Sequence, residues 1–162
     1  MSVAEIELIQ DSTSPPVTNR APICSASAQS MLEDTTLPLT ISGTDADGVA
    51  LSFSVVTAPT NGVLSGIAPN LIYTPFVDRT GLDSFQFVAS DGAVSSAPAT
   101  VSIEITPTND APTAYSTSAT LAEGSTVPIT LTATDVDGNP LTFMVVRGPA
   151  NGTLSGTAPN LT

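Results

Sequence analysis

Carboxylates in a short turn motif are the residues of this chain best suited to do chemistry. Asp45 and Asp47 lie two residues apart in the sequence Thr-Asp-Ala-Asp-Gly, and Asp135 and Asp137 repeat the arrangement later in the chain. A turn that ends in glycine could direct both carboxylates of a pair toward one point. Oxygen ligands of this kind suit hard cations such as Ca²⁺. The alternative is plain turn chemistry, since Asp-Gly is also favoured in turns that bind no metal.

The composition excludes several other kinds of chemistry. The 162 residues carry 15 Asp and Glu against 3 Lys and Arg, a formal net charge of −12, and no His. The lack of His excludes Ser-His-Asp triads and His-based zinc sites. All three cations are Arg, so the chain lacks a Schiff-base lysine. The three lie far apart in the sequence and cannot form a basic patch for nucleic acid unless folding gathers them. We expect the single cysteine, Cys24, to pack as a small apolar residue.

The sequence contains an internal repeat of about 90 residues. Residues 59–66 return as 149–156, and 68–71 return as 158–161. Asn-x-Ala-Pro segments at 19–22 and 109–112 mark the boundaries. We therefore predict a complete repeat over 20–108, a truncated second repeat over 109–162, and the last strand of a preceding repeat plus a linker over 1–19. The first residues do not resemble a secretory signal, and we expect the chain to be part of a longer array.

Alternating apolar residues predict the elements that would position the acids. Period-2 patterns occur at 37–41, 51–55, 85–89 and 101–105, with a shorter candidate at 71–73. Turn dipeptides lie between them at 47–48, 61–62 and 91–92. About seven short strands in about 90 residues predict an all-β, Greek-key immunoglobulin-like sandwich. We expect its core to contain Phe53, Phe76, Phe85 and Phe87.

Three motifs resemble a known family. They are Thr-Asp-x-Asp-Gly at 44–48, Phe-x-Phe-Val-x-Ser-Asp-Gly at 85–92, and Val-Ser-Ile-Glu-Ile-Thr-Pro-Thr-Asn-Asp-Ala-Pro at 101–112. Together they resemble the cadherin-like tandem repeats of large bacterial surface adhesins, over essentially the whole chain. The resemblance implies cadherin-like β-sandwich repeats in an array that Ca²⁺ stiffens where consecutive domains meet.

The chain order and the resemblance together give a set of candidate metal ligands. Asp91 follows a predicted strand, and we expect it at the same end of the sandwich as Asp45 and Asp47. The resemblance implies that Glu33 takes the place of the early-loop glutamate of a cadherin domain, or else is a solvated loop acid. It also implies that the remaining ligands come from the linker and from repeat 2: Asn109, Asp110, Asp135 and Asp137.

The chain also departs from the cadherin pattern. Asp78-Arg79-Thr80 lacks the glutamate of the Asp-Arg-Glu motif, and Arg20 stands at the upstream boundary where Asp110 stands at the next. We therefore expect the junction between the two repeats to be the better calcium site. The other acids are expected to be surface charge: Asp34, Asp83, Glu5, Glu7 and Glu104.

These observations predict an extracellular structural or adhesive repeat of a larger bacterial surface or secreted protein, not an enzyme. The expected partners are neighbouring repeats, homophilic contacts or surface glycans, with no nucleic acid and no membrane insertion. The alternative is a carbohydrate- or matrix-binding β-sandwich module, although Trp is absent and Tyr is limited to Tyr73 and Tyr115. We also expect repeat 2 to expose an apolar face and strand edges. It could then be disordered, aggregate, or take up residues 3–9 of another molecule.

Overall fold

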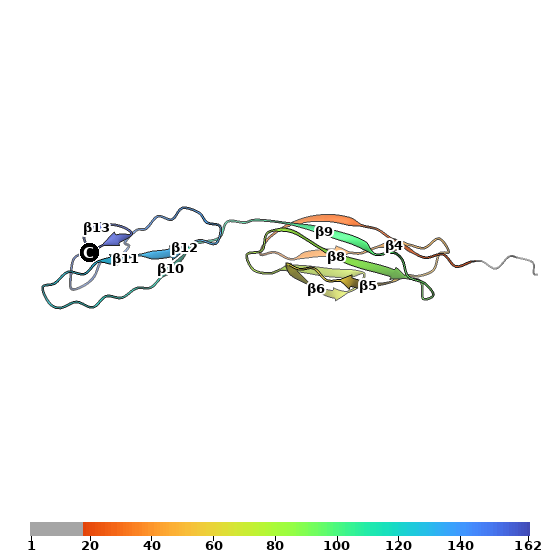
Figure 1. Ribbon diagram of the computed structural model, residues 1–162, viewed down its shortest axis with the longest axis horizontal. Coiled ribbons are helices and arrows are strands. Elements are labelled where there is room, and N and C mark those ends of the chain that lie inside the picture. The colour runs from red at the N-terminus through yellow and green to blue at the C-terminus, as the bar shows by residue number, and fades with distance from the viewer. Residues whose placement is uncertain (1–17) are drawn as a thin grey trace, which may run out of the picture.

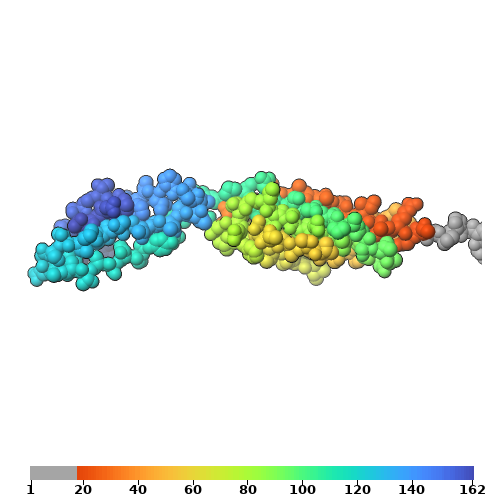
Figure 2. Space-filling model, in the orientation of Figure 1, coloured from red at the N-terminus to blue at the C-terminus, as the bar shows by residue number. Residues whose placement is uncertain are grey.

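The computed structural model describes residues 18–162, and within them every regular element is a strand. The predicted strand near the N-terminus lies outside the described residues. The all-β prediction is confirmed, and no helix in the described part could span a membrane. Figures 1 and 2 show two bodies placed end to end, which we call repeat 1 (20–108) and repeat 2 (109–162).

Repeat 1 is a sandwich of two main sheets (Figure 1). The first sheet has the order β2-β9-β8-β5, and the second has the order β3-β7-β6. The short strands β1 and β4 pair separately, and β2 runs parallel to β9. The bounds are β1 Ile23–Cys24, β2 Ser27–Leu32, β3 Leu37–Thr40, β4 Gly43–Thr44, β5 Ser52–Thr57, β6 Gly62–Ile67, β7 Asn70–Pro75, β8 Gly81–Ser90 and β9 Ala99–Thr106.

The period-2 pattern locates the core as predicted in β8 and β9. Alternate residues of both strands are buried, and the largest fully buried side chains of the repeat are Tyr73, Phe85, Phe87, Ile103 and Ile105. Phe53 packs against this core, with its ring centroid 6.2 Å from that of Phe87. Cys24 also packs against the core, as expected.

The prediction that Phe76 belongs to the core is wrong. Phe76 is 49% exposed, because it follows the last residue of β7 and escapes the alternation that turns Tyr73 and Pro75 inward. Its backbone N–H donates to the carbonyl of Asn61, which holds the main chain there without burying the ring.

Repeat 2 contains a counterpart of the β3-β7-β6 sheet of repeat 1 but none of the β2-β9-β8-β5 sheet. Its strands are β10 Thr113–Tyr115, β11 Ile129–Thr130, β12 Thr132–Thr134, β13 Gly156–Thr157 and β14 Asn160–Leu161. The counterparts of β2 and β5, at 117–122 and 142–147, form no strand. In repeat 1 those strands pair with β9 and β8, and residues 109–162 contain no counterpart of either.

Candidate metal centre at the junction of the repeats

The Thr-Asp-x-Asp-Gly motif forms the same turn in both repeats. In repeat 1, Oδ1 of Asp45 accepts the backbone N–H of Asp47 at 2.8 Å, and the N–H of Gly48 donates to the carbonyl of Asp45. Gly48 has a φ of +76°, a conformation that costs other residues energy. The first aspartate therefore closes the turn, while the second is free to point outward.

The second aspartate of each turn receives the linker that precedes its repeat. Oδ2 of Asp137 accepts the backbone N–H of Asp110 at 2.7 Å, as Oδ2 of Asp47 accepts that of Arg20 at 2.7 Å. Asn139 adds a 2.6 Å bond from its amide to Oδ1 of Asn109. The linker is thus fixed to the turn of repeat 2 by hydrogen bonds.

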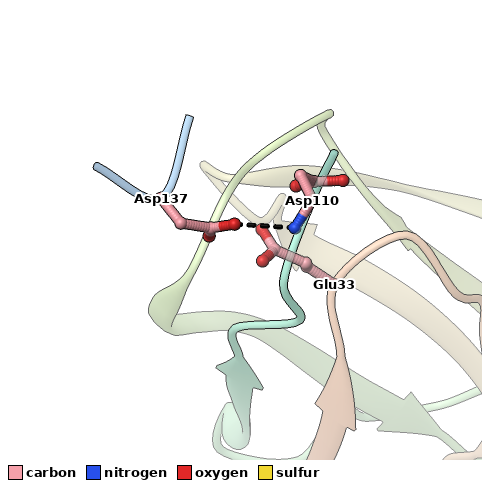
Figure 3. A group of neighbouring side chains, drawn as sticks. All are labelled: Glu33, Asp110 and Asp137. Atoms are coloured by element: carbon pink, nitrogen blue, oxygen red, sulfur yellow. Dashed lines mark hydrogen bonds between the residues drawn. The ribbon is translucent and has the colours of Figure 1, made fainter. Parts of the chain in front are cut away.

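The end of repeat 1 brings Glu33 to the same place (Figure 3). Glu33 directly follows β2 and is only 3% exposed. Its Oε1 accepts the backbone N–H of Thr108 at 2.9 Å. Glu33, Asp110 and Asp137 each offer a carboxylate oxygen, and these three oxygens lie within 4.8 Å of one another. Three of the predicted ligands therefore meet at the junction.

A second group of acids shares Asp110. Asp34 and Asp78 place carboxylate oxygens within 4.8 Å of each other and of one from Asp110. Both have positive φ, 59° and 55°, in the left-handed region that Asp tolerates better than most residues. Asp34 is exposed, as the prediction of a surface charge requires, but it also belongs to this group of acids. Its position directly after Glu33 in the sequence could have indicated that it lies at the junction. Asp78 belongs to the incomplete Asp-Arg-Thr motif.

The electrostatics of the junction centre on Asp110. Desolvation raises the pKa of its carboxyl, and the neighbouring charges of Asp34, Asp78, Asp137 and Glu33 raise that pKa further. Its Oδ2 is buried and has no hydrogen-bond partner among the described residues. An open pocket of about 360 Å³ adjoins it, lined in part by Asp78 and Asp135. Asp135 therefore lies beside the site, outside both three-acid groups.

The upstream end of repeat 1 is built differently. The amide of Asn19 donates to Oδ2 of Asp91 at 2.7 Å, so Asp91 does lie at the end where Arg20 meets Asp47. Hydrogen bonds from the backbone of Val94, the amide of Asn19 and the backbone of Ala93 lower the pKa of Asp91. Among residues 18–162, Asp45, Asp47 and Asp91 form no three-acid group like those at the junction.

The prediction that Asp83 is surface charge is wrong. Asp83 is only 6% exposed, and its Oδ2 accepts a hydrogen bond from the hydroxyl of buried Tyr73 at 2.7 Å. It also accepts the backbone N–H groups of Thr60 and Asn61, both at 2.9 Å. Asp83 sits at a position of β8 that faces inward by alternation, so the period-2 pattern could have indicated its burial.

The arrangement can bind a hard divalent cation. Carboxylates held by backbone N–H groups are preorganised oxygen ligands, and carbonyls and water commonly complete a Ca²⁺ shell. The Glu33, Asp110 and Asp137 group draws its members from repeat 1, the linker and repeat 2. An ion held there would contact both repeats.

The fold and the internal repeat define one β-sandwich followed by a partial second copy, and sequence comparison identifies the family. The chain belongs to the bacterial Ig domain family, Big_9, which matches residues 19–104 and 109–162. No curated protein matches the chain.

Parts of three solved structures are similar to this chain. The endo-fucoidan hydrolase MfFcnA4 of glycoside hydrolase family 107 is 17% identical with a TM-score of 0.48, over 90% of this chain and 24% of that one. A variant of that enzyme is 22% identical with a TM-score of 0.47, over the same shares. The hydrolase MfFcnA9 of the same family is 20% identical with a TM-score of 0.40, over 56% of this chain and 16% of that one. The chain thus spans a quarter or less of these proteins.

Proposed function

We propose that this chain is a calcium-stiffened structural repeat of an extracellular or cell-surface bacterial protein, similar in design to cadherin-like adhesin repeats. The observation that carries the proposal is the meeting of Glu33, Asp110 and Asp137 from three separate segments, with oxygens within 4.8 Å. An ion at that point would couple repeat 1, the linker and repeat 2.

The charge balance of the junction supports a cation there. Four acids lie near Asp110 in two groups that share it; desolvation raises the pKa of Asp110, and repulsion by the neighbouring charges raises it further. A divalent cation would remove this repulsion and provide a partner for the buried Oδ2 of Asp110. Without it, the same charges favour separation of the repeats, so the interdomain angle would depend on Ca²⁺.

The surroundings of the ligands also favour binding. Glu33 is oriented by the N–H of Thr108, and Asp137 by the N–H of Asp110. Fixed ligands lose little conformational freedom when an ion binds. The partner that we propose for each repeat is therefore the neighbouring repeat of the same chain, and the ion would bridge the two.

The carbohydrate-binding alternative has less support. Tyr73 is fully buried and cannot stack on a sugar. Tyr115 is 52% exposed, but its hydroxyl pairs with Thr134 at 2.8 Å. We therefore do not propose a glycan platform on these residues.

Calorimetric titration of the whole chain with Ca²⁺ tests the proposal. We expect saturable binding with a Kd of about 10⁻⁴–10⁻³ M, the range of extracellular modules. Asp137→Asn should weaken it at least about tenfold, which is about 1.4 kcal/mol of binding free energy. The matched control is Asp47→Asn, the equivalent substitution at the upstream end, which should leave this binding unchanged. No binding by the wild type, or equal loss in both variants, would contradict the proposal.

A further inference from the structure

Two strands at opposite ends of the sequence of repeat 1 lie side by side and run in the same direction. β2 pairs in parallel with β9 over six positions, from Ser27 opposite Val101 to Leu32 opposite Thr106. Figure 1 shows β9 along the long axis of the molecule. The chain enters β2 at the upstream end of repeat 1 and leaves β9 at the junction end, so a pull on the two ends would slide these strands past each other.

Strand β2 is held mainly by its backbone pairing. It lies at the edge of the β2-β9-β8-β5 sheet, where β9 is its neighbour. Of its six residues only Met31 is buried, so few side-chain contacts hold it to the core. The hydrogen bonds of a parallel pair are evenly spaced along both strands. Detachment of β2 therefore requires that the bonds to β9 break.

Three further hydrogen bonds close the junction end of the pair. The N–H of Glu33 donates to the carbonyl of Thr106 at 3.0 Å, and the hydroxyl of Thr106 donates to the carbonyl of Met31 at 2.9 Å. The N–H of Thr108 donates to Oε1 of Glu33 at 2.9 Å. Because Glu33 is buried, water competes little for these bonds. They extend the pairing beyond β2, to the point where the chain leaves repeat 1.

We propose that repeat 1 bears tension along the protein, and that the β2-β9 pair is the element that resists unfolding under this load. The chain continues on both sides of the repeat, so a pull along it acts on the upstream end of β2 and on the junction end of β9. Strand β1 precedes β2 but pairs with β4 at two positions, so it adds little resistance.

The direction of the pull decides how the bonds share the load. A pull from opposite ends of the pair loads all its hydrogen bonds together, and they must break together. A pull that separates the two strands from one end loads the bonds one after another, so a much smaller force is enough. Repeat 1 would thus hold a tensile load in addition to keeping its neighbours apart.

No calcium is needed for this resistance, so single-molecule pulling in EDTA tests it separately from the calcium site. The whole chain, in a Cys24→Ser background, carries DNA handles on two introduced cysteines. Ala26→Cys with Thr108→Cys loads β2 and β9 in shear, whereas Ala26→Cys with Pro98→Cys pulls both strands apart from the upstream end. All three positions are exposed, and all precede repeat 2, so the load bypasses repeat 2.

We expect a rupture force several-fold higher for the shear pair. Forced unfolding reports the barrier along the direction of the pull, and the fold is the same in both proteins. Equal rupture forces for the two pairs of handles would overturn the proposal.

A substitution at the junction end tests the closing bonds. Thr106→Val keeps a similar shape but removes the hydroxyl that donates to Met31. With the shear handles we expect unfolding about fivefold faster at a fixed force, which corresponds to about 1 kcal/mol, the usual net contribution of one hydrogen bond. The matched control is Thr100→Val, because the hydroxyl of Thr100 accepts from Gln86 of β8 and lies outside the β2-β9 contact. Equal acceleration in both variants, or none in Thr106→Val, would overturn the assignment of the resistance to this pair.

Discussion

At the scale of single residues, acids of one type serve opposite purposes. The carboxylate of Asp83 is buried, which alone would raise its pKa, but hydrogen bonds from Thr60, Tyr73 and others outweigh burial and lower it. Asp110 has a raised pKa, because desolvation and neighbouring charges oppose its ionisation and no hydrogen bond to its Oδ2 compensates. The ionised carboxylate of Asp83 thus stabilises the fold, whereas the ionised carboxylate of Asp110 destabilises the junction.

The depressed pKa of Asp83 sets the sign of a pH effect. Its contribution to stability is present above the ordinary aspartate pKa near 3.8 and is lost as pH falls through the lower value of the folded state. Asp83→Asn should reduce the free energy of unfolding of repeat 1 by about 2 kcal/mol at neutral pH, because the amide keeps only one acceptor oxygen.

Denaturant unfolding at pH 7 and again below pH 4 measures this loss. The difference between wild type and Asp83→Asn should shrink in acid, and Glu104→Gln on the exposed side of β9 serves as the control. A difference in the free energy of unfolding that stays constant between these pH values would show that the ionised carboxylate of Asp83 does not stabilise the fold.

The sequence predicts the structural roles of the turn aspartates better than those of the buried acids. Asp47 and Asp137 are recognisable because their motif is local, and a repeated local motif folds the same way twice. The roles of Asp34 and Asp78 depend on left-handed backbone at two loops that meet only in the folded protein, which no short-range pattern encodes.

At the scale of elements, the pairing of β6 with β7 depends on one close contact. A Cβ added to Gly62 would lie 2.5 Å from the carbonyl oxygen of Thr74 and 2.6 Å from the ring of Tyr73. Both neighbours are held firmly, since Tyr73 is fully buried and bonded to Asp83. Strand β6 was not predicted, because its sequence lacks a clear period-2 pattern and its position depends on this glycine.

Gly62→Ala should therefore destabilise repeat 1 by about 1–3 kcal/mol, the usual cost of overpacking a core. Gly152→Ala is a matched control, because Gly152 is the counterpart in repeat 2 and an added Cβ there meets nothing within 4 Å. Thermal unfolding of both variants compares them. An equal effect at the two positions would show that the contact with Tyr73 does not limit the strand pairing.

At the scale of the whole molecule, two similar boundaries have different chemistry. The upstream boundary holds Arg20, Asp47 and an Asn19–Asp91 hydrogen bond, whereas the junction of the repeats gathers Glu33, Asp110 and Asp137. The replacement of Asp110 by Arg20 is visible in the sequence and predicts this difference. The contact between Glu33 and the linker is not visible in the sequence, because it depends on how β2 ends beside β9.

We predict that Ca²⁺ at the junction fixes the angle between the repeats. Electron spin resonance can measure the distance between labels on Ser54→Cys in β5 and Thr132→Cys in β12, in a Cys24→Ser background. Labelled protein is diluted with unlabelled protein so that only distances within one chain are read.

In EDTA the acids at the junction repel, so we expect a broad distribution of distances. Millimolar Ca²⁺ should narrow it to a single peak, and Asp137→Asn should restore the broad distribution. A distribution of distances that is the same with and without Ca²⁺ would show that the ion does not fix the angle between the repeats.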